Sequence, residues 1–99
     1  MNDRISESHL ARYQTISREA IKKARVAAPA KTHLARAAED ILDLAERYIA
    51  DAAHFSERGD RVRALSAVNY AHGLLDAAAR IGLLSVDHDS RLFIVDEKP

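Results

Sequence analysis

The sequence predicts an all-α protein, a three-helix antiparallel (up-down-up) bundle with a short extended C-terminal tail. Over three long segments, apolar residues recur at steps of three and four, as they do on one face of an α-helix. Proline or glycine lies between these segments and ends each helix. Because 99 residues suit one core and not two, we expect residues 1–99 to form a single helical-bundle domain.

The first helix is predicted over residues 4–27. A short side-chain oxygen at Asp3 or Ser6 can cap it by accepting from an amide of the first turn. Pro29 interrupts the pattern, either within the connection or as the first residue of the next helix. The apolar face consists of Leu10, Tyr13, Ile16 or Ser17, Ala20, Ala24 and Ala27.

The second helix is predicted over residues 32–58 and carries the most regular apolar pattern. Leu42 and Ile49 widen that face enough for it to contact two neighbouring helices, as a bundle of three requires. Gly59 ends the helix, because glycine enters the left-handed cap conformation at little cost. The main apolar positions are Leu34, Ala38, Ile41, Ala45, Tyr48, Ala52 and Phe55.

The third helix is predicted over residues 60–81, with Asp60 as its cap and Gly82 after its end. The short turn at Gly59 and Asp60 makes the second and third helices antiparallel neighbours. Gly73 costs about 1 kcal/mol relative to alanine inside a helix, so we expect it to lie at a close helix contact. The apolar face consists of Ala64, Ala67, Ala71, Leu74, Ala78 and Ile81, broadened by Leu65, Val68 and Leu75.

The tail, residues 83–99, has a different composition from the helices. A turn-forming stretch is followed by a short, partly β-branched apolar run at residues 92–95. We expect this run to lie extended over a groove of the bundle, or to pair with a second copy of the chain.

Charge and composition narrow the class of protein. Fifteen basic residues balance fifteen acidic ones, so no global field attracts nucleic acid or an acidic membrane. The chain has no cysteine, which excludes a disulfide framework and thiol catalysis. It has neither the apolar core of a signal peptide nor an apolar run near the roughly 20 residues that span a bilayer. We therefore expect a cytoplasmic protein with no membrane contact and no cofactor.

The helical hairpin resembles a known family. Residues 48–60, which end in Gly59 and Asp60, and residues 64–84, which contain the string NYAHGLLDA at 69–77, are similar to the archaeal family called domain of unknown function 357. The likeness covers roughly residues 32–95. The resemblance implies a compact helical bundle in an archaeal cytoplasm, and it implies no activity, cofactor or catalytic residue.

One polar stripe is the candidate binding face of the third helix. Its members, at steps of three, four and four, are Asn69, His72, Asp76 and Arg80. One interpretation is a set of surface pairs, His72 with Asp76 and Asp76 with Arg80. In the other, the hairpin brings Asp43 and Arg47 of the second helix to His72 and Asp76, where the cluster could bind a cation or act as acid and base. No metal-binding sequence pattern supports the second interpretation, and we assign no metal ligand and no catalytic residue.

Three functions follow from these features. The leading hypothesis is a non-catalytic module that binds another protein or itself, since alanine-rich helical hairpins offer shallow grooves to a helix. The first alternative is a nucleic-acid or nucleotide-binding accessory domain, based on basic residues at Arg18, Lys22, Lys23, Arg25, Lys31 and Arg36. The second alternative is a metal-assisted hydrolase that uses Asn69, His72 and Asp76.

Overall fold

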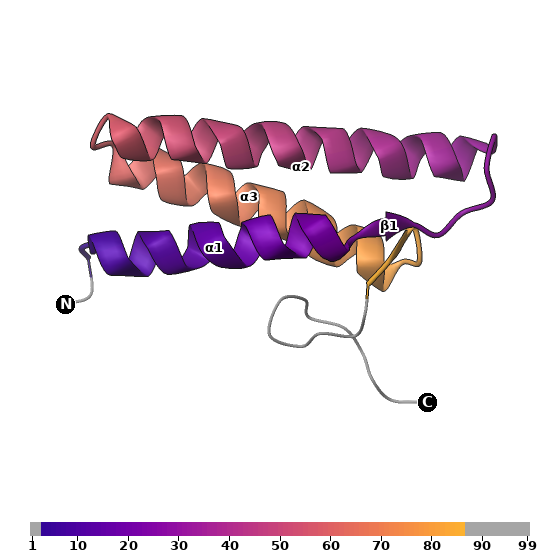
Figure 1. Cartoon of the computed structure of the whole chain (residues 1–99), viewed down its shortest axis with the longest axis horizontal. Coiled ribbons are helices and arrows are strands. Elements are labelled where there is room, and N and C mark those ends of the chain that lie inside the picture. Colours follow the sequence, from indigo (N-terminus) through magenta and orange to yellow (C-terminus); the bar gives the residue numbers. More distant parts are fainter. Residues whose placement is uncertain (1–2, 87–99) are drawn as a thin grey trace, which may run out of the picture.

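The computed structural model describes residues 3–86, and it confirms the predicted three-helix bundle. Figure 1 shows the up-down-up course of the helices, which are α1 (Glu7–Lys23), α2 (His33–Glu57) and α3 (Arg61–Arg80). Two short strands, β1 (Arg25–Val26) and β2 (Leu84–Ser85), follow α1 and α3. None of the described helices combines the length and the apolar composition that crossing a membrane requires. The apolar run predicted to be extended, residues 92–95, lies outside the described residues.

The first helix is shorter at both ends than predicted. Ser6, and not Asp3, is the cap, since its Oγ accepts a hydrogen bond from the backbone N–H of His9 at 3.1 Å. The helix therefore begins at Glu7 instead of residue 4. It ends at Lys23 instead of residue 27, because Ala24 already has extended backbone angles.

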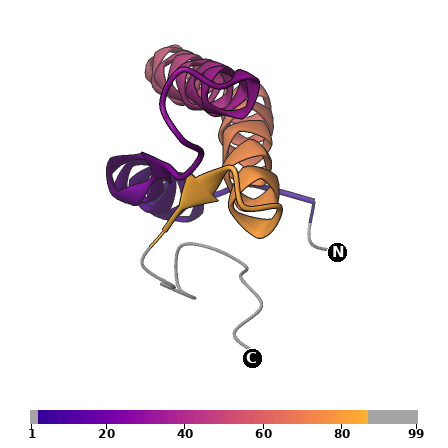
Figure 2. The same ribbon diagram turned by 90° about the vertical axis from the view of Figure 1, so that its right-hand side faces the viewer.

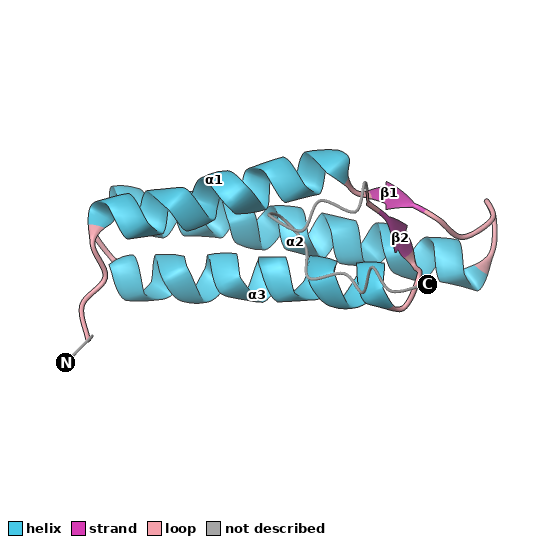
Figure 3. Ribbon diagram, turned by 90° about the horizontal axis from the view of Figure 1, so that it is seen from below, coloured by secondary structure: helices cyan, strands magenta, loops and turns pink. Residues whose placement is uncertain are grey.

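A strand pair that was not predicted explains the early end of α1. Strand β1 pairs antiparallel with β2, with Val26 opposite Leu84, and the backbone N–H of Ala27 donates to the carbonyl of Leu83 at 3.0 Å. This pairing satisfies backbone groups that a longer α1 would have satisfied internally. It also places Leu84 in the core, at the end of the bundle where both strands lie (Figure 3). Residues 84–85, at the start of the predicted extended tail, thus pair with residues 25–26, which were wrongly predicted to belong to the first helix.

The connection before α2 contains Pro29, which was predicted to lie either in the loop or at the first position of the helix. Pro29 lies in the loop, and Thr32 is the cap of α2. The Thr32 hydroxyl accepts from the backbone N–H of Ala35 at 3.1 Å and donates to the carbonyl of Pro29 at 2.7 Å. The same hydroxyl therefore closes the loop and begins the helix.

The turn between α2 and α3 has the predicted chemistry. Gly59 adopts a φ of 78°, and the backbone N–H of Asp60 donates to the carbonyl of Phe55 at 2.9 Å. These features form the glycine-ended cap known as a Schellman motif. The carboxylate of Asp60 then accepts from the backbone N–H of Arg63 at 3.1 Å and caps α3. Two residues thus end one helix and begin the next.

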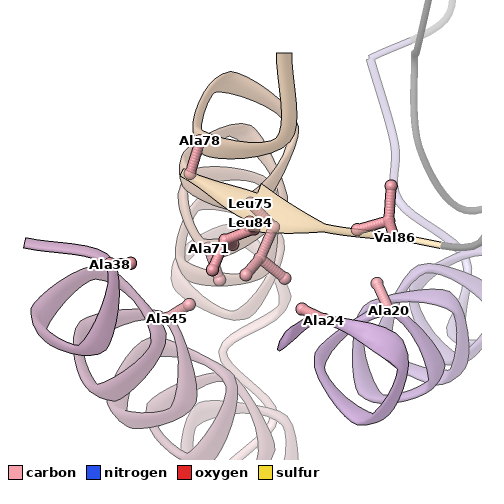
Figure 4. Close-up of a cluster of buried hydrophobic side chains, with 9 residues drawn as sticks. All are labelled: Ala20, Ala24, Ala38, Ala45, Ala71, Leu75, Ala78, Leu84 and Val86. Carbon is pink, nitrogen blue, oxygen red and sulfur yellow. The ribbon is translucent and has the colours of Figure 1, made fainter. Parts of the chain in front are cut away.

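The core where the helices meet is built mainly from alanine (Figure 4). Figure 2, an end-on view, shows α3 beside both α1 and α2. Methyl side chains allow close helix approach, and Leu75 and Leu84 fill the space that remains. The buried alanines of the described residues are Ala20, Ala24, Ala35, Ala38, Ala45, Ala52, Ala64, Ala67, Ala71 and Ala78.

Three large side chains predicted on apolar faces lie substantially exposed, and Ala27 is exposed as well. Leu34 in the first turn of α2 is 59% exposed, and Ala35 beside it is buried. Ile81 is 73% exposed because α3 ends at Arg80 and Ile81 is only its C-cap. Tyr13 on α1 is also exposed, and its neighbour Gln14 is buried.

The position of Gly73 contradicts the prediction of a close helix contact. Gly73 lies on an exposed face of α3, and a Cβ built on it would meet nothing within 4 Å. Within the described residues, no packing contact therefore offsets the cost of glycine in this helix.

Leu75→Ala is expected to lower the free energy of unfolding by about 2–5 kcal/mol, because it leaves a cavity at the centre of the core. Chemical denaturation followed by circular dichroism measures the change. Leu34→Ala removes the same atoms from an exposed site of α2 and should change stability by less than about 0.5 kcal/mol. Equal losses in the two variants would contradict the described core.

Gly73→Ala is expected to raise the free energy of unfolding by up to about 1 kcal/mol, because alanine has the higher helix propensity and the site has room for a methyl group. The same denaturation measurement tests it. Destabilisation would instead mean that this face of α3 is closely covered in solution.

Candidate functional site

The predicted polar stripe of α3 is partly buried in its middle. Asn69 and Arg80 are exposed, whereas the side chains of His72 and Asp76 keep only 24% and 18% of their accessible surface. The Nε2 atom of His72 lies 3.5 Å from Oδ2 of Asp76. The predicted contact between His72 and Asp76 is thus present, one helical turn apart.

The two site residues predicted on α2 form a second pair. Arg47 Nη2 donates to Asp43 Oδ2 at 2.6 Å, again one turn apart. Their side chains remain 71% and 55% exposed. A pair this exposed contributes only a few tenths of a kcal/mol to stability, because solvent screens it.

The structure gives these two separate pairs in place of the single cluster considered from the sequence. The hairpin turn does bring this part of α2 beside this part of α3, since the ring centroids of Tyr48 and Tyr70 lie 4.6 Å apart, but height along a helix does not decide which side a residue occupies. Asp43 and Arg47 lie on the side of α2 opposite buried Ala45. Among residues 3–86, no three histidine, aspartate or glutamate side chains lie close enough together to hold a metal ion.

Part of the predicted basic cluster has a structural role. Arg25 Nη1 donates to the carbonyls of Lys22 and Ala24, so its guanidinium group satisfies the C-terminal end of α1. Arg18, Lys22, Lys31 and Arg36 are exposed. On α2, three further polar residues at steps of three, Asp51, His54 and Glu57, are exposed as well.

Two hollows in the surface were not predicted. The first, which we call the α2 groove, has a volume of about 420 Å³ and is lined by Ala37, Asp40, Ile41, Asp43, Leu44 and Arg47. The predicted residues Asp43 and Arg47 therefore border a partly apolar depression. The spacing of Ala37, Ile41 and Leu44 is the sequence signal for this second apolar edge of α2.

The second hollow, which we call the turn pocket, lies between α1 and the turn that joins α2 to α3. It has a volume of about 680 Å³ and is lined by Glu7, Leu10, Ala11, Gln14, Ser56, Gly59, Asp60, Arg61 and Val62. Gln14 is the residue that the sequence reasoning missed. It follows Leu10 by four positions, and buried Ser17 follows it by three, so the helical spacing marks it as core-facing.

Comparison with known proteins identifies a family and no function. The family model described as "Protein of unknown function (DUF357)" matches residues 12–84. The match begins within α1, well before the region where the resemblance was seen in the sequence, and it ends in β2. No curated protein and no solved structure matches the chain. Because the family model covers most of the chain and all but the start of the helical bundle, the chain belongs to the DUF357 family.

Proposed function

We propose that this chain is a non-catalytic helical module whose partner is a second copy of itself, bound through the α2 groove. The observation that carries the proposal is the combination of apolar and charged residues in that groove. Ala37, Ile41 and Leu44 recur at steps of four and three, the spacing with which one helix receives another. A function of this kind needs no reactive group.

The charges beside the groove favour an antiparallel pair of α2 helices. Asp40 and Arg47 are seven residues apart, so they lie on the same flank of α2. In an antiparallel two-fold pair, each flank meets the same flank of the other helix. A two-fold axis passing between Asp43 and Leu44 would set Asp40 of each copy opposite Arg47 of the other.

Arg47 can take part in this contact without losing its present partner. Its guanidinium group has five N–H donors, and only one of them is used in the bond to Asp43. Asp40, which lies about one helical turn before Asp43, is exposed. Opposite charges in this arrangement set the register and the direction of the pair more than its strength.

The composition of the core supports an apolar contact outside it. Alanine occupies most buried positions, so larger apolar side chains such as Ile41 and Leu44 are only partly covered within one copy. Covering them against a second copy would remove further apolar surface from water. The depression is shallow, so we expect a reversible dimer with a dissociation constant in the micromolar to millimolar range.

The place of action in this proposal is the cytoplasm of an archaeal cell, as expected from the composition and the family resemblance. The two alternative functions, nucleic-acid association and metal-assisted hydrolysis at Asn69, His72 and Asp76, stay predictions from the sequence. No contact or cavity described above favours either of them over self-association.

Leu44→Glu is expected to abolish the dimer, because it places a charge at the centre of the pairing face without entering the core. Sedimentation velocity of the full chain over a range of concentrations measures the association. The matched control is Leu34→Glu, which puts the same charge on an exposed leucine of α2 outside the groove and should leave association unchanged.

Asp40→Arg is expected to weaken the dimer about threefold to tenfold, since each of the two symmetric contacts becomes a like-charge pair. The double variant Asp40→Arg with Arg47→Asp should recover most of the loss by exchanging the two charges. A folded wild-type chain that stays monomeric up to about 1 mM would overturn the proposal. Equal association of the single and double variants would overturn the antiparallel arrangement.

A further inference from the structure

We propose that the turn pocket binds an uncharged small molecule that presents an amide edge, a hydrogen-bond donor beside an acceptor, to the side chain of Gln14. This inference does not depend on self-association, because the turn pocket and the α2 groove share no lining residue. The burial of Gln14 and the charges around the pocket support it.

Gln14 is a polar side chain in a core-facing position of α1. It is 9% exposed, and no hydrogen bond joins its side chain to another described residue. Desolvating a primary amide without a partner costs a few kcal/mol, so such a group is normally bonded or has access to solvent. In the described part of the chain, no fully buried side-chain nitrogen or oxygen lacks a partner. The amide of Gln14 therefore keeps part of the small accessible surface of this residue, and Gln14 lines the turn pocket.

The charged groups around the pocket are already compensated. Arg61 Nη2 lies 3.0 Å from Glu7 Oε1, and Arg61 Nη1 donates to the carbonyl of Ile5 at 2.9 Å. The Asp60 carboxylate caps α3 and lies 3.5 Å from Nε of Arg63. The carboxylates of Glu7 and Asp60 line the pocket, and Asp60 already caps the N-terminus of α3, so an anion would be repelled there. A cation would meet the positive charge of Arg61 beside Glu7. An uncharged ligand fits these surroundings.

The remaining lining defines the shape of such a ligand. Leu10 lies at the wall of the pocket but is almost fully buried, whereas Val62, on the opposite element, is an exposed apolar residue that a ligand can contact. Gln14 has both a carbonyl oxygen and an NH₂ group, so it can pair with an amide edge through two parallel hydrogen bonds. A volume of about 680 Å³ falls within the range of small-molecule sites.

Nuclear magnetic resonance titration of the ¹⁵N-labelled full chain tests the proposal. The probes are nicotinamide, which carries its amide on an aromatic ring, and N-acetylalanine amide, which carries two amides on a flexible aliphatic frame. We expect saturable shifts of the Gln14 side-chain NH₂ and of the Leu10 and Val62 backbone signals, at about 1–10 mM for ligands of this size. Preference for one probe distinguishes a planar heterocycle from a peptide-like ligand.

Gln14→Leu is expected to weaken binding at least about tenfold, because it removes both hydrogen bonds and keeps the apolar volume. Gln14→Glu keeps the size of the side chain and loses its NH₂ donor, so it should also weaken binding. This variant replaces Gln14→Leu in the test if the leucine variant does not fold. The control is Thr15→Val, a change at an exposed neighbouring position of α1 that should leave binding unaltered.

Two outcomes would overturn the inference. One is the lack of any saturable shift of Leu10 and Val62 with either probe up to about 50 mM. The other is unchanged binding by a folded Gln14→Leu or Gln14→Glu variant. Sedimentation velocity of Gln14→Leu distinguishes a failure of this inference from a failure of the proposed function. The dimer should persist in this variant whether or not the turn pocket binds a ligand.

Discussion

The close approach of helices through alanine is the constraint on which the rest of this structure depends. Ala45 on α2 and Ala71 on α3 are completely buried within the same core cluster, and a closely packed core resists a larger side chain at such positions. The core therefore has few large buried residues, and Leu75 and Leu84 are two of them. Apolar residues such as Ile41 and Leu44 stay at the edge of the bundle, where they line the groove proposed for a second copy.

The helices were predictable because their signals are local. Gly59 with Asp60 and Thr32 acted as the predicted boundaries, since each provides chemistry that a helix end requires by itself. The end of α1 was not predictable in this way. Nothing near Ala24 breaks a helix, and the chain extends there because Val26 pairs with Leu84, nearly sixty residues away.

The candidate sites were less predictable than the fold. Helical spacing correctly paired His72 with Asp76, because that contact lies within one helix. It could not join them to Asp43 and Arg47, because the side of α2 that faces α3 is set by packing. Gln14 was missed since a polar residue among core positions gives no apolar signal. The turn pocket brings together residues of α1 with the junction of α2 and α3, and only the tertiary structure shows such a site.

The most direct test of this account is the stability of Ala71→Leu compared with Ala77→Leu. Both changes add the same atoms to α3, at a fully buried position and at an exposed one. If alanine sets the helix separation, Ala71→Leu should lower the free energy of unfolding by about 1–3 kcal/mol through overpacking. Ala77→Leu should change it by less than about 0.5 kcal/mol. Unchanged or increased stability of Ala71→Leu would contradict the account, because it would show that the helices are not held together at alanine distance.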